Sequence, residues 1–262
     1  MFSLQILFFL LLFVAGLVFG SFLNALEWRL HEKKSLNTRS ECPKCHKMIG
    51  WYDNVPIFSF LFLRGKCRHC HEKISWQYPI VELLLAFLFC FVFYYHLSFI
   101  LIGGNFSWLF IIRDCLSLFV LLFIFIYDTK YMEVSDIMTL GSAGIIFVLS
   151  LFLQVSWLSM LIGAMIGSGF FLLQFVISKG KWIGGGDIRI GLLMGIILGW
   201  KLLLLALWLA YIIGGIVSII FVLSKKKKMM TEVAFGNYLS LATFIAMFFG
   251  TYILDWYFRL IF

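Results

Sequence analysis

Four cysteines stand in two pairs, Cys42-Pro-Lys-Cys45 and Cys67-Arg-His-Cys70, with 21 residues between the pairs. Two CxxC pairs at such a distance supply four thiolates to one tetrahedral zinc ion. A redox-active CxxC is normally set in a strand–helix pattern, and that pattern is missing around these cysteines. A four-thiolate site leaves no coordination position open for substrate, so we predict a structural zinc ion. The neighbouring His46, His69 and His71 are expected at the surface beside it.

Three aspartates lie at the edges of long apolar runs. Asp128 ends one run, Asp136 begins the next, and Asp187 begins a later run. Ionisable side chains at the edge of a membrane span are costly and tend to be functional. A helix C-terminus disfavours negative charge, so Asp128 is expected to serve chemistry. Asp136 is expected to cap the helix that it begins.

The glycines Gly184, Gly185 and Gly186 directly precede Asp187. Glycines permit close approach of another backbone, which a protease needs in order to admit an extended peptide. Two carboxylates that come close can share one proton and hydrolyse a peptide bond without a metal. Spacing alone does not bring Asp128 and Asp187 together, and an ion-coupled transporter also uses intramembrane carboxylates. The residues by themselves leave both an aspartic protease and a transporter open.

The elements that must position these residues are membrane spans. Of 262 residues, 63% are hydrophobic and 13% are charged, and the mean hydropathy is +1.02. These values exclude an ordinary soluble domain, a disordered chain and a secreted disulfide scaffold. We predict an all-α polytopic membrane protein of about eight spans with a small zinc-binding insert after the first. The expected spans are 4–24, 79–100, 108–127, 137–154, 157–178, 187–200, 202–223 and 234–254.

The basic residues predict the orientation of these spans. Residues 25–78 hold ten of the 21 Lys and Arg, and 225–228 are four lysines, whereas the 96–107 and 153–158 loops hold none. Because Lys and Arg accumulate in cytoplasmic loops, both termini are expected outside, with the cysteine loop and the aspartates on the cytoplasmic side. The first span lacks a basic start and is expected to remain uncleaved. The expected division is 1–24 for the first span, 25–78 for the insert and 79–262 for the core.

The net charge of +8 comes mostly from the Lys and Arg residues that accumulate in the predicted cytoplasmic loops. It therefore indicates anionic lipid headgroups as partners rather than nucleic acid.

The chain resembles the bacterial type IV prepilin peptidases, which belong to the GxGD aspartyl proteases. The matching motifs follow one another along the chain: Gly20-Ser21-Phe22-Leu23-Asn24, the cysteine loop, Tyr78-Pro79-Ile80-Val81-Glu82, Asp128 eight residues before Asp136, Gly184-Gly185-Gly186-Asp187 and Val233-Ala234-Phe235-Gly236. Arg189 replaces the usual lysine, and Ser135, Ala234 and Asn237 replace prolines.

The resemblance implies a membrane enzyme of the bacterial cytoplasmic membrane. It would cut the short basic leader from type IV prepilins and pseudopilins and then methylate the new N-terminus with S-adenosylmethionine. Asp128 and Asp187 would be catalytic, with Asp136 and the glycines in support, and a basic leader would meet Asp53, Glu82 or Glu133. No residue is assigned to S-adenosylmethionine, and a peptidase-only member is the alternative. The sequence does not predict the oligomeric state.

Overall fold

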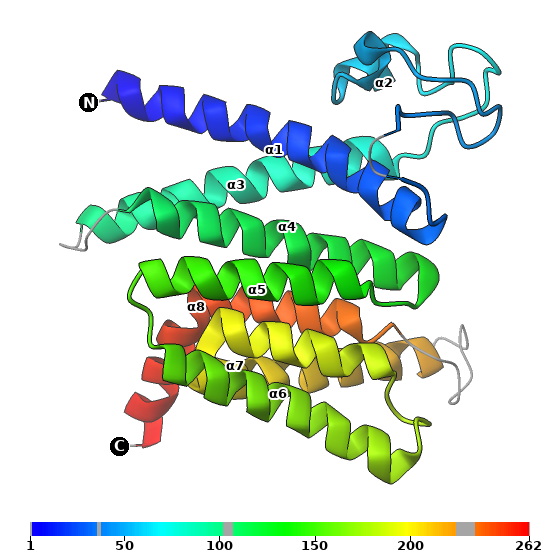
Figure 1. Cartoon of the computed structure of the whole chain (residues 1–262). Coiled ribbons are helices and arrows are strands. Elements are labelled where there is room, and N and C mark those ends of the chain that lie inside the picture. Colours follow the sequence, from blue (N-terminus) through cyan, green and yellow to red (C-terminus); the bar gives the residue numbers. More distant parts are fainter. Residues whose placement is uncertain (1, 36–37, 102–106, 224–233, 262) are drawn as a thin grey trace. The chain divides into compact units, whose positions relative to one another are not determined.

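The structure is a computed structural model that describes residues 2–35, 38–101, 107–223 and 234–261 (Figure 1). Within these ranges every regular element is a helix, apart from two isolated β-bridges, and the rest is turns and irregular segments. It divides into two compact units, Met1–Cys115 and Leu116–Phe262, and the division falls inside one helix, α4 (Trp108–Tyr131).

Helices α1 (Phe2–His31) and α3 (Gln77–Leu101) form the frame of the first unit. They approach closely because α1 carries two glycines one turn apart, Gly16 and Gly20. A Cβ atom at Gly16 would lie 2.4 Å from the Cα of Ala86, and one at Gly20 would lie 2.6 Å from the Cα of Glu82. Small residues four apart are the usual device for packing helices in lipid, where no hydrophobic effect drives the helices together.

A polar cluster ties α3 to the beginning of α4. The Asp114 carboxylate is 3% exposed, and its oxygens lie 2.8 Å from Nε2 of His96 and 2.6 Å from the guanidinium of Arg113. Asp114 thus contacts the neighbouring helix α3 through His96.

Between α1 and α3 the chain forms the cysteine-bearing insert, which contains the short helices η1 (Trp51–Asn54) and α2 (Phe58–Phe62). Glu82 of α3 fixes the start of α2, because its Oε2 accepts a 2.8 Å hydrogen bond from the N–H of Ile57. Ile57 has φ +61°, a conformation that a β-branched residue rarely adopts. The sequence suggested Glu82 as a partner for a basic leader, but Glu82 is only 5% exposed and its carboxylate instead holds the insert.

The second unit contains the rest of α4 together with α5 (Asp136–Phe152), α6 (Trp157–Ser178), α7 (Gly185–Leu223) and α8 (Gly236–Ile261). Helix α7 is broken at Gly199, whose φ is +69° and ψ 174°. Along the first half of α7, Gly191 lies against Gly167 of α6 and Gly199 against Ser159. Tyr211, beyond the break, is hydrogen-bonded to Gln174 near the other end of α6. The second half of α7 therefore runs back along α6, and α7 is a helical hairpin.

The contact between α6 and α7 is a seam of glycines. Gly163 and Gly167 of α6 face Gly195 and Gly191 of α7, four residues apart on both helices. A Cβ at Gly167 would lie 2.2 Å from the carbonyl oxygen of Gly191, and one at Gly195 would lie 2.2 Å from the carbonyl carbon of Gly163. The two backbones are therefore in direct contact, which only glycine allows.

The predicted fold class is confirmed. Among the described residues, six helices are long and apolar enough to cross a membrane, namely α1, α3, α4, α6, α7 and α8, and α5 is a shorter apolar helix. The two spans predicted at 187–200 and 202–223 are the two halves of α7, so seven helices supply the eight predicted segments. Helix α1 continues to His31, beyond the predicted end at residue 24. The lysines at 225–228 and Val233 lie outside the described residues.

The glycine seam gives a matched test of packing within one helix. Gly167→Ala is expected to destabilise the protein by about 1–3 kcal/mol, because the added methyl group overlaps backbone atoms that cannot move aside. Gly169→Ala is the control, since a Cβ at Gly169 has nothing within 4 Å. Thermal unfolding of both variants in the same detergent measures the difference, and equal melting temperatures would contradict the seam.

Candidate active site and metal centre

Asp128 is buried near the end of α4 and faces the beginning of α8. Its side chain is enclosed, and the residue is only 6% exposed. The backbone N–H groups of Gly236 and Asn237 donate to its carboxylate. These N–H groups have no partner within their own helix, and the positive end of the α8 dipole favours a negative charge there. A second helix thus compensates the unfavourable position of Asp128 at the end of α4.

Asp187 lies in the first turn of α7, and its carboxylate is held by the turn itself. Its backbone N–H donates to the carbonyl of Gly184 at 3.2 Å, and its carboxylate accepts a hydrogen bond from the Gly184 N–H. The bond from the Gly184 N–H to the carboxylate is one half of a capping box, the half that orients an acidic side chain at the third helical position. Asp187 is 8% exposed.

The structure brings Asp128 and Asp187 to one end of the second unit, within range of each other's electrostatic field. Oδ2 of Asp128 is buried without a hydrogen-bond partner among the described residues. The same oxygen lies 2.8 Å from the position that a Cβ on Gly236 would occupy. Gly236 therefore leaves room for this oxygen.

The glycines before Asp187 differ from one another in their surroundings. A Cβ at Gly186 would lie 2.4 Å from Cγ2 of Val134, in the connection between α4 and α5. A Cβ at Gly185 would have nothing within 4 Å, and Gly184 and Gly185 are both exposed. Gly186 is thus required for packing, whereas Gly184 and Gly185 leave the backbone beside Asp187 open.

Asp136 and Arg189 connect the beginnings of α5 and α7. Asp136 is the first residue of α5, and its carboxylate forms an ion pair with the Arg189 guanidinium, two residues beyond Asp187. The expected capping role is not observed, because the N-cap position is held by Ser135, whose side chain makes no cap hydrogen bond. The reason is that Arg189, distant in sequence, provides the carboxylate with a better partner than the backbone.

Two residues near the aspartates were not identified from the sequence as part of the site. Asn237 donates from Nδ2 to the hydroxyl of Thr129 at 2.9 Å and so attaches the start of α8 to the residue after Asp128. The phenol of Tyr211, 2.9 Å from Oε1 of Gln174, lies within electrostatic range of Asp187. Polar residues inside apolar runs were the available signal, but only the hairpin at Gly199 returns Tyr211 to this end of the bundle.

The four cysteines of the insert form one cluster. The Sγ atoms of Cys42, Cys45, Cys67 and Cys70 all lie within 4.8 Å of one another, and those of Cys42 and Cys70 are 3.9 Å apart. Four sulfurs at about 2.3 Å from a tetrahedral zinc ion are about 3.8 Å apart, so the donor set and its spacing fit zinc. Among the described residues this cluster contains no histidine, and His46, His69 and His71 are exposed, as expected.

The two halves of the cluster are copies of one turn, 25 residues apart. In the first, Cys42 N–H donates to the Lys47 carbonyl and His46 N–H to the Cys42 carbonyl. In the second, the Cys67 N–H donates to the Glu72 carbonyl, and the His71 N–H donates to the Cys67 carbonyl. His46 and His71 have φ values of 54° and 57°. Each histidine therefore closes a turn through its backbone, which explains why it follows the second cysteine of each pair.

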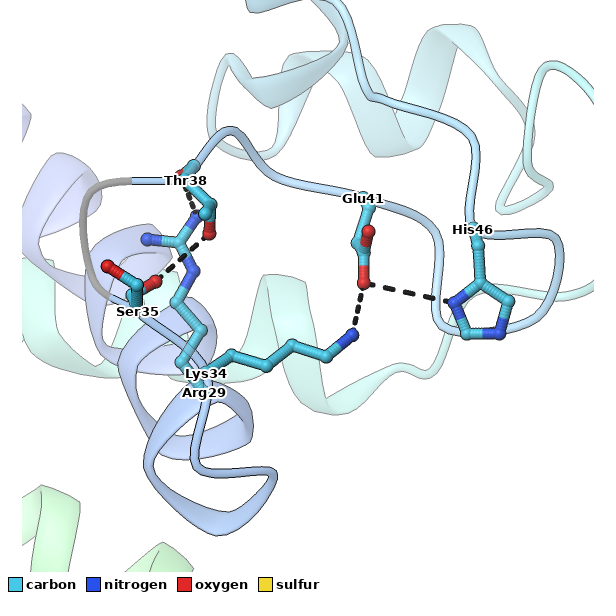
Figure 2. Close-up of polar contacts among 6 residues, drawn as sticks. All are labelled: Arg29, Lys34, Ser35, Thr38, Glu41 and His46. Atoms are coloured by element: carbon cyan, nitrogen blue, oxygen red, sulfur yellow. Dashed lines mark hydrogen bonds and ion pairs between the residues drawn. The ribbon is translucent and has the colours of Figure 1, made fainter.

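Hydrogen bonds and an ion pair attach the first turn to the end of α1 (Figure 2). The Arg29 guanidinium donates to the carbonyl of Thr38 at 2.6 Å, and the Lys34 ammonium pairs with the Glu41 carboxylate. The hydrogen bond from Lys34 lowers the pKa of Glu41 below its ordinary value. These contacts connect the cluster to a membrane helix.

Asp53, which the sequence suggested as a partner for a basic leader, is engaged within the insert. Its carboxylate accepts two short hydrogen bonds from Arg68, 2.7 Å from Nη2 and 2.9 Å from Nε. This bidentate pairing lowers the pKa of Asp53. Arg68 lies between Cys67 and Cys70, so the ion pair braces the second turn.

Two family models match the chain: the bacterial peptidase A24 N-terminal domain over residues 14–96 and the type IV leader peptidase family over residues 115–219. The prepilin leader peptidase/N-methyltransferase of Aeromonas hydrophila is 32% identical to this chain, with 96% of this chain and 94% of the relative aligned. The chain belongs to the prepilin leader peptidase/N-methyltransferase family.

Other members of the family match in the same way. The Pseudomonas aeruginosa protein of the same name is 28% identical, covering 90% of this chain and 88% of the relative. The Myxococcus xanthus protein is 42% identical over 84 residues, which are 32% of this chain and 25% of that relative. No solved structure matches the chain.

Family membership confirms the resemblance found in the sequence and the prediction of an enzyme. It also decides between the two classes that the aspartates left open, in favour of the peptidase over the transporter. The six apolar helices agree with a multi-pass membrane protein.

Replacing one cysteine tests the metal centre. We expect the purified wild-type protein to contain one zinc ion per chain and Cys67→Ser to contain none, because three thiolates hold zinc far more weakly than four. Cys90→Ser is the control, since Cys90 lies in α3 outside the cluster. Elemental analysis of the detergent-purified proteins measures the metal, and a zinc-free wild-type protein that unfolds normally would refute the assignment.

Proposed function

We propose that this protein is a membrane aspartic endopeptidase that removes the leader from prepilins and pseudopilins. The observation that supports this most directly is the pair of buried carboxylates, Asp128 and Asp187, at one end of the second unit. The substrate class comes from family membership, since the relatives are named prepilin leader peptidases.

In the proposed mechanism the two carboxylates share one proton. Like charges in one buried site disfavour double ionisation, so one aspartate stays protonated while the other is a base. The ionised carboxylate takes a proton from water as the water oxygen bonds to the scissile carbonyl carbon. The protonated carboxylate gives its proton to the leaving nitrogen as the C–N bond breaks. Oδ2 of Asp128, which has no partner among the described residues, is suited to one of these transfers.

The open backbone at Gly184 and Gly185 provides an approach to the aspartates. Both glycines are exposed, and the carboxylate of Asp187 lies directly beside them, with Oδ2 4.0 Å from a Cβ position on Gly184. An extended peptide can lie against a backbone without side chains and bring its carbonyl carbon to the carboxylates. This is the role we assign to the first two glycines.

The second activity in the family name is N-methylation, and we propose that it follows cleavage here. S-adenosylmethionine would supply the methyl group to the amine that hydrolysis releases. We assign no described residue to this cofactor and derive no step through it. A peptidase-only enzyme is distinguished from this proposal by the mass of the processed N-terminus, which methylation raises.

Neutralising either aspartate tests the dyad. Asp128→Asn or Asp187→Asn is expected to lower the rate of prepilin cleavage by about 100-fold or more, because general acid–base catalysis requires both groups. The reaction is followed by mass spectrometry of the product N-terminus, using full-length enzyme and a candidate prepilin in liposomes. The variants should retain zinc and normal unfolding.

Asp255→Asn provides the control for the aspartate variants. Asp255 is exposed near the end of α8, away from the first turn of that helix. The Asp255→Asn variant should cleave the prepilin at the wild-type rate. Normal turnover by either dyad variant would overturn the mechanism.

The glycines of the GxGD motif offer a second, independent test. Gly186→Ala is expected to reduce cleavage by about 100-fold, because its methyl group overlaps Val134 and displaces Asp187. Gly169→Ala, a substitution in α6 outside the motif, should remain close to wild type, since nothing lies within 4 Å of its Cβ. Adding Val134→Ala to Gly186→Ala should restore activity by removing the overlapping atoms. A defect in Gly186→Ala that Val134→Ala does not relieve would show that the glycine acts otherwise.

A further inference from the structure

The insert carries an apolar surface that no described residue covers. Three residues of α2 project from one side of its single turn: Phe58, Leu61 and Phe62 are 58%, 63% and 84% exposed. Their spacing of three and four residues places them on one helical face. The opposite side packs inward, where Ser59 is buried and the ring of Phe60 lies 4.9 Å from that of Trp76.

The hydrogen bond between Ile57 and Glu82 gives the depth of this surface. Glu82 lies five residues inside the apolar span Gln77–Ser98, about 7.5 Å along the helix from its start. Since the Ile57 N–H is 2.8 Å from Oε2 of Glu82, α2 begins beside the first turns of α3 and not beyond its end. At the same level α1 presents Gly20, within its uncharged stretch 1–26.

Basic and aromatic side chains stand next to α2 in the order that a membrane boundary requires. The five residues of α2 are uncharged, and the basic residues Arg64 and Lys66, both exposed, come directly after the helix. Trp76, 68% exposed, stands immediately before the α3 span. Aromatic side chains at the headgroup level, with basic side chains reaching the phosphates, are typical of segments that lie in the interface.

We propose that α2 is an interfacial helix whose Phe58–Leu61–Phe62 face lies in the membrane leaflet at this end of the spans, with Arg64 and Lys66 against anionic phospholipid headgroups. An apolar face held about 5–10 Å into the headgroup boundary is the usual position of such helices, and the Glu82 contact gives a depth in that range. The metal cluster would then be anchored to the bilayer on one side and to α1 on the other.

The proposal is tested by measuring which solvent the α2 face meets. Full-length protein carrying trifluoromethyl-phenylalanine in place of Phe62 is placed in nanodiscs of phosphatidylethanolamine and phosphatidylglycerol. Fluorine line widths are recorded with a lipid bearing a nitroxide near the top of its acyl chain, and separately with a water-soluble gadolinium chelate. The same probe in place of Lys47, an exposed polar position of the insert, is the control.

We expect the lipid nitroxide to broaden the probe at 62 several-fold more than the probe at 47, and the gadolinium chelate to do the reverse. Replacing phosphatidylglycerol with phosphatidylcholine should weaken the lipid effect at 62. Equal broadening of both probes by gadolinium would overturn the proposal. So would protection of the probe at 62 that arises only when a prepilin is added, because the face would then bind a peptide. Zinc content, measured in parallel, verifies that the insert is folded.

Discussion

Two carboxylates buried in an apolar helix bundle need hydrogen-bond donors, and in this protein the donors are the free N–H groups at helix N-termini. Asp187 takes the N–H of Gly184 at the start of α7, and Asp128 takes those of Gly236 and Asn237 at the start of α8. Charges transferred from water into such a medium are otherwise too costly to retain. The beginnings of α7 and α8 must therefore converge on the end of α4, and the hairpin at Gly199 and the glycine seam with α6 are what allow these helices to pack closely enough.

Glycine serves two purposes in this arrangement. At Gly163, Gly167, Gly191 and Gly195 it brings backbones into contact. This packing stabilises the bundle in lipid, where no hydrophobic effect drives the helices together. Beside the aspartates it makes space for an oxygen of Asp128 at Gly236 and for Val134 at Gly186, while Gly185 leaves the backbone next to Asp187 open. The same residue type thus supplies rigidity along the spans and access at the site.

The insert is stabilised by different interactions, because a loop of this size has little hydrophobic core of its own. Four thiolates, two repeated turns and the Asp53–Arg68 pair hold it together, while Arg29, Lys34 and Glu82 attach it to α1 and α3. In small domains that bind structural zinc, metal coordination replaces hydrophobic burial as the main constraint, and the spacing of these four thiolates fits such an ion. The apolar side chains of Phe58, Leu61 and Phe62 are exposed, which is stable where the surroundings are lipid.

The roles of Asp128 and Asp187 as a pair were predicted from the resemblance to a known family. Composition, the positions of the basic residues and residue spacing were sufficient to predict the membrane class, the apolar helical segments and the cluster of four thiolates. These properties are local or additive, so they can be read along the chain. The sequence did not predict the pairing of Asp136 with Arg189, the burial of Glu82 against Ile57 or the position of Tyr211 near Asp187. Each depends on the distance between residues far apart in the chain. Only the packing of the helices sets that distance. A polar group in an apolar medium pairs with whichever polar group the neighbouring helix places beside it, and the sequence does not show which helices are neighbours.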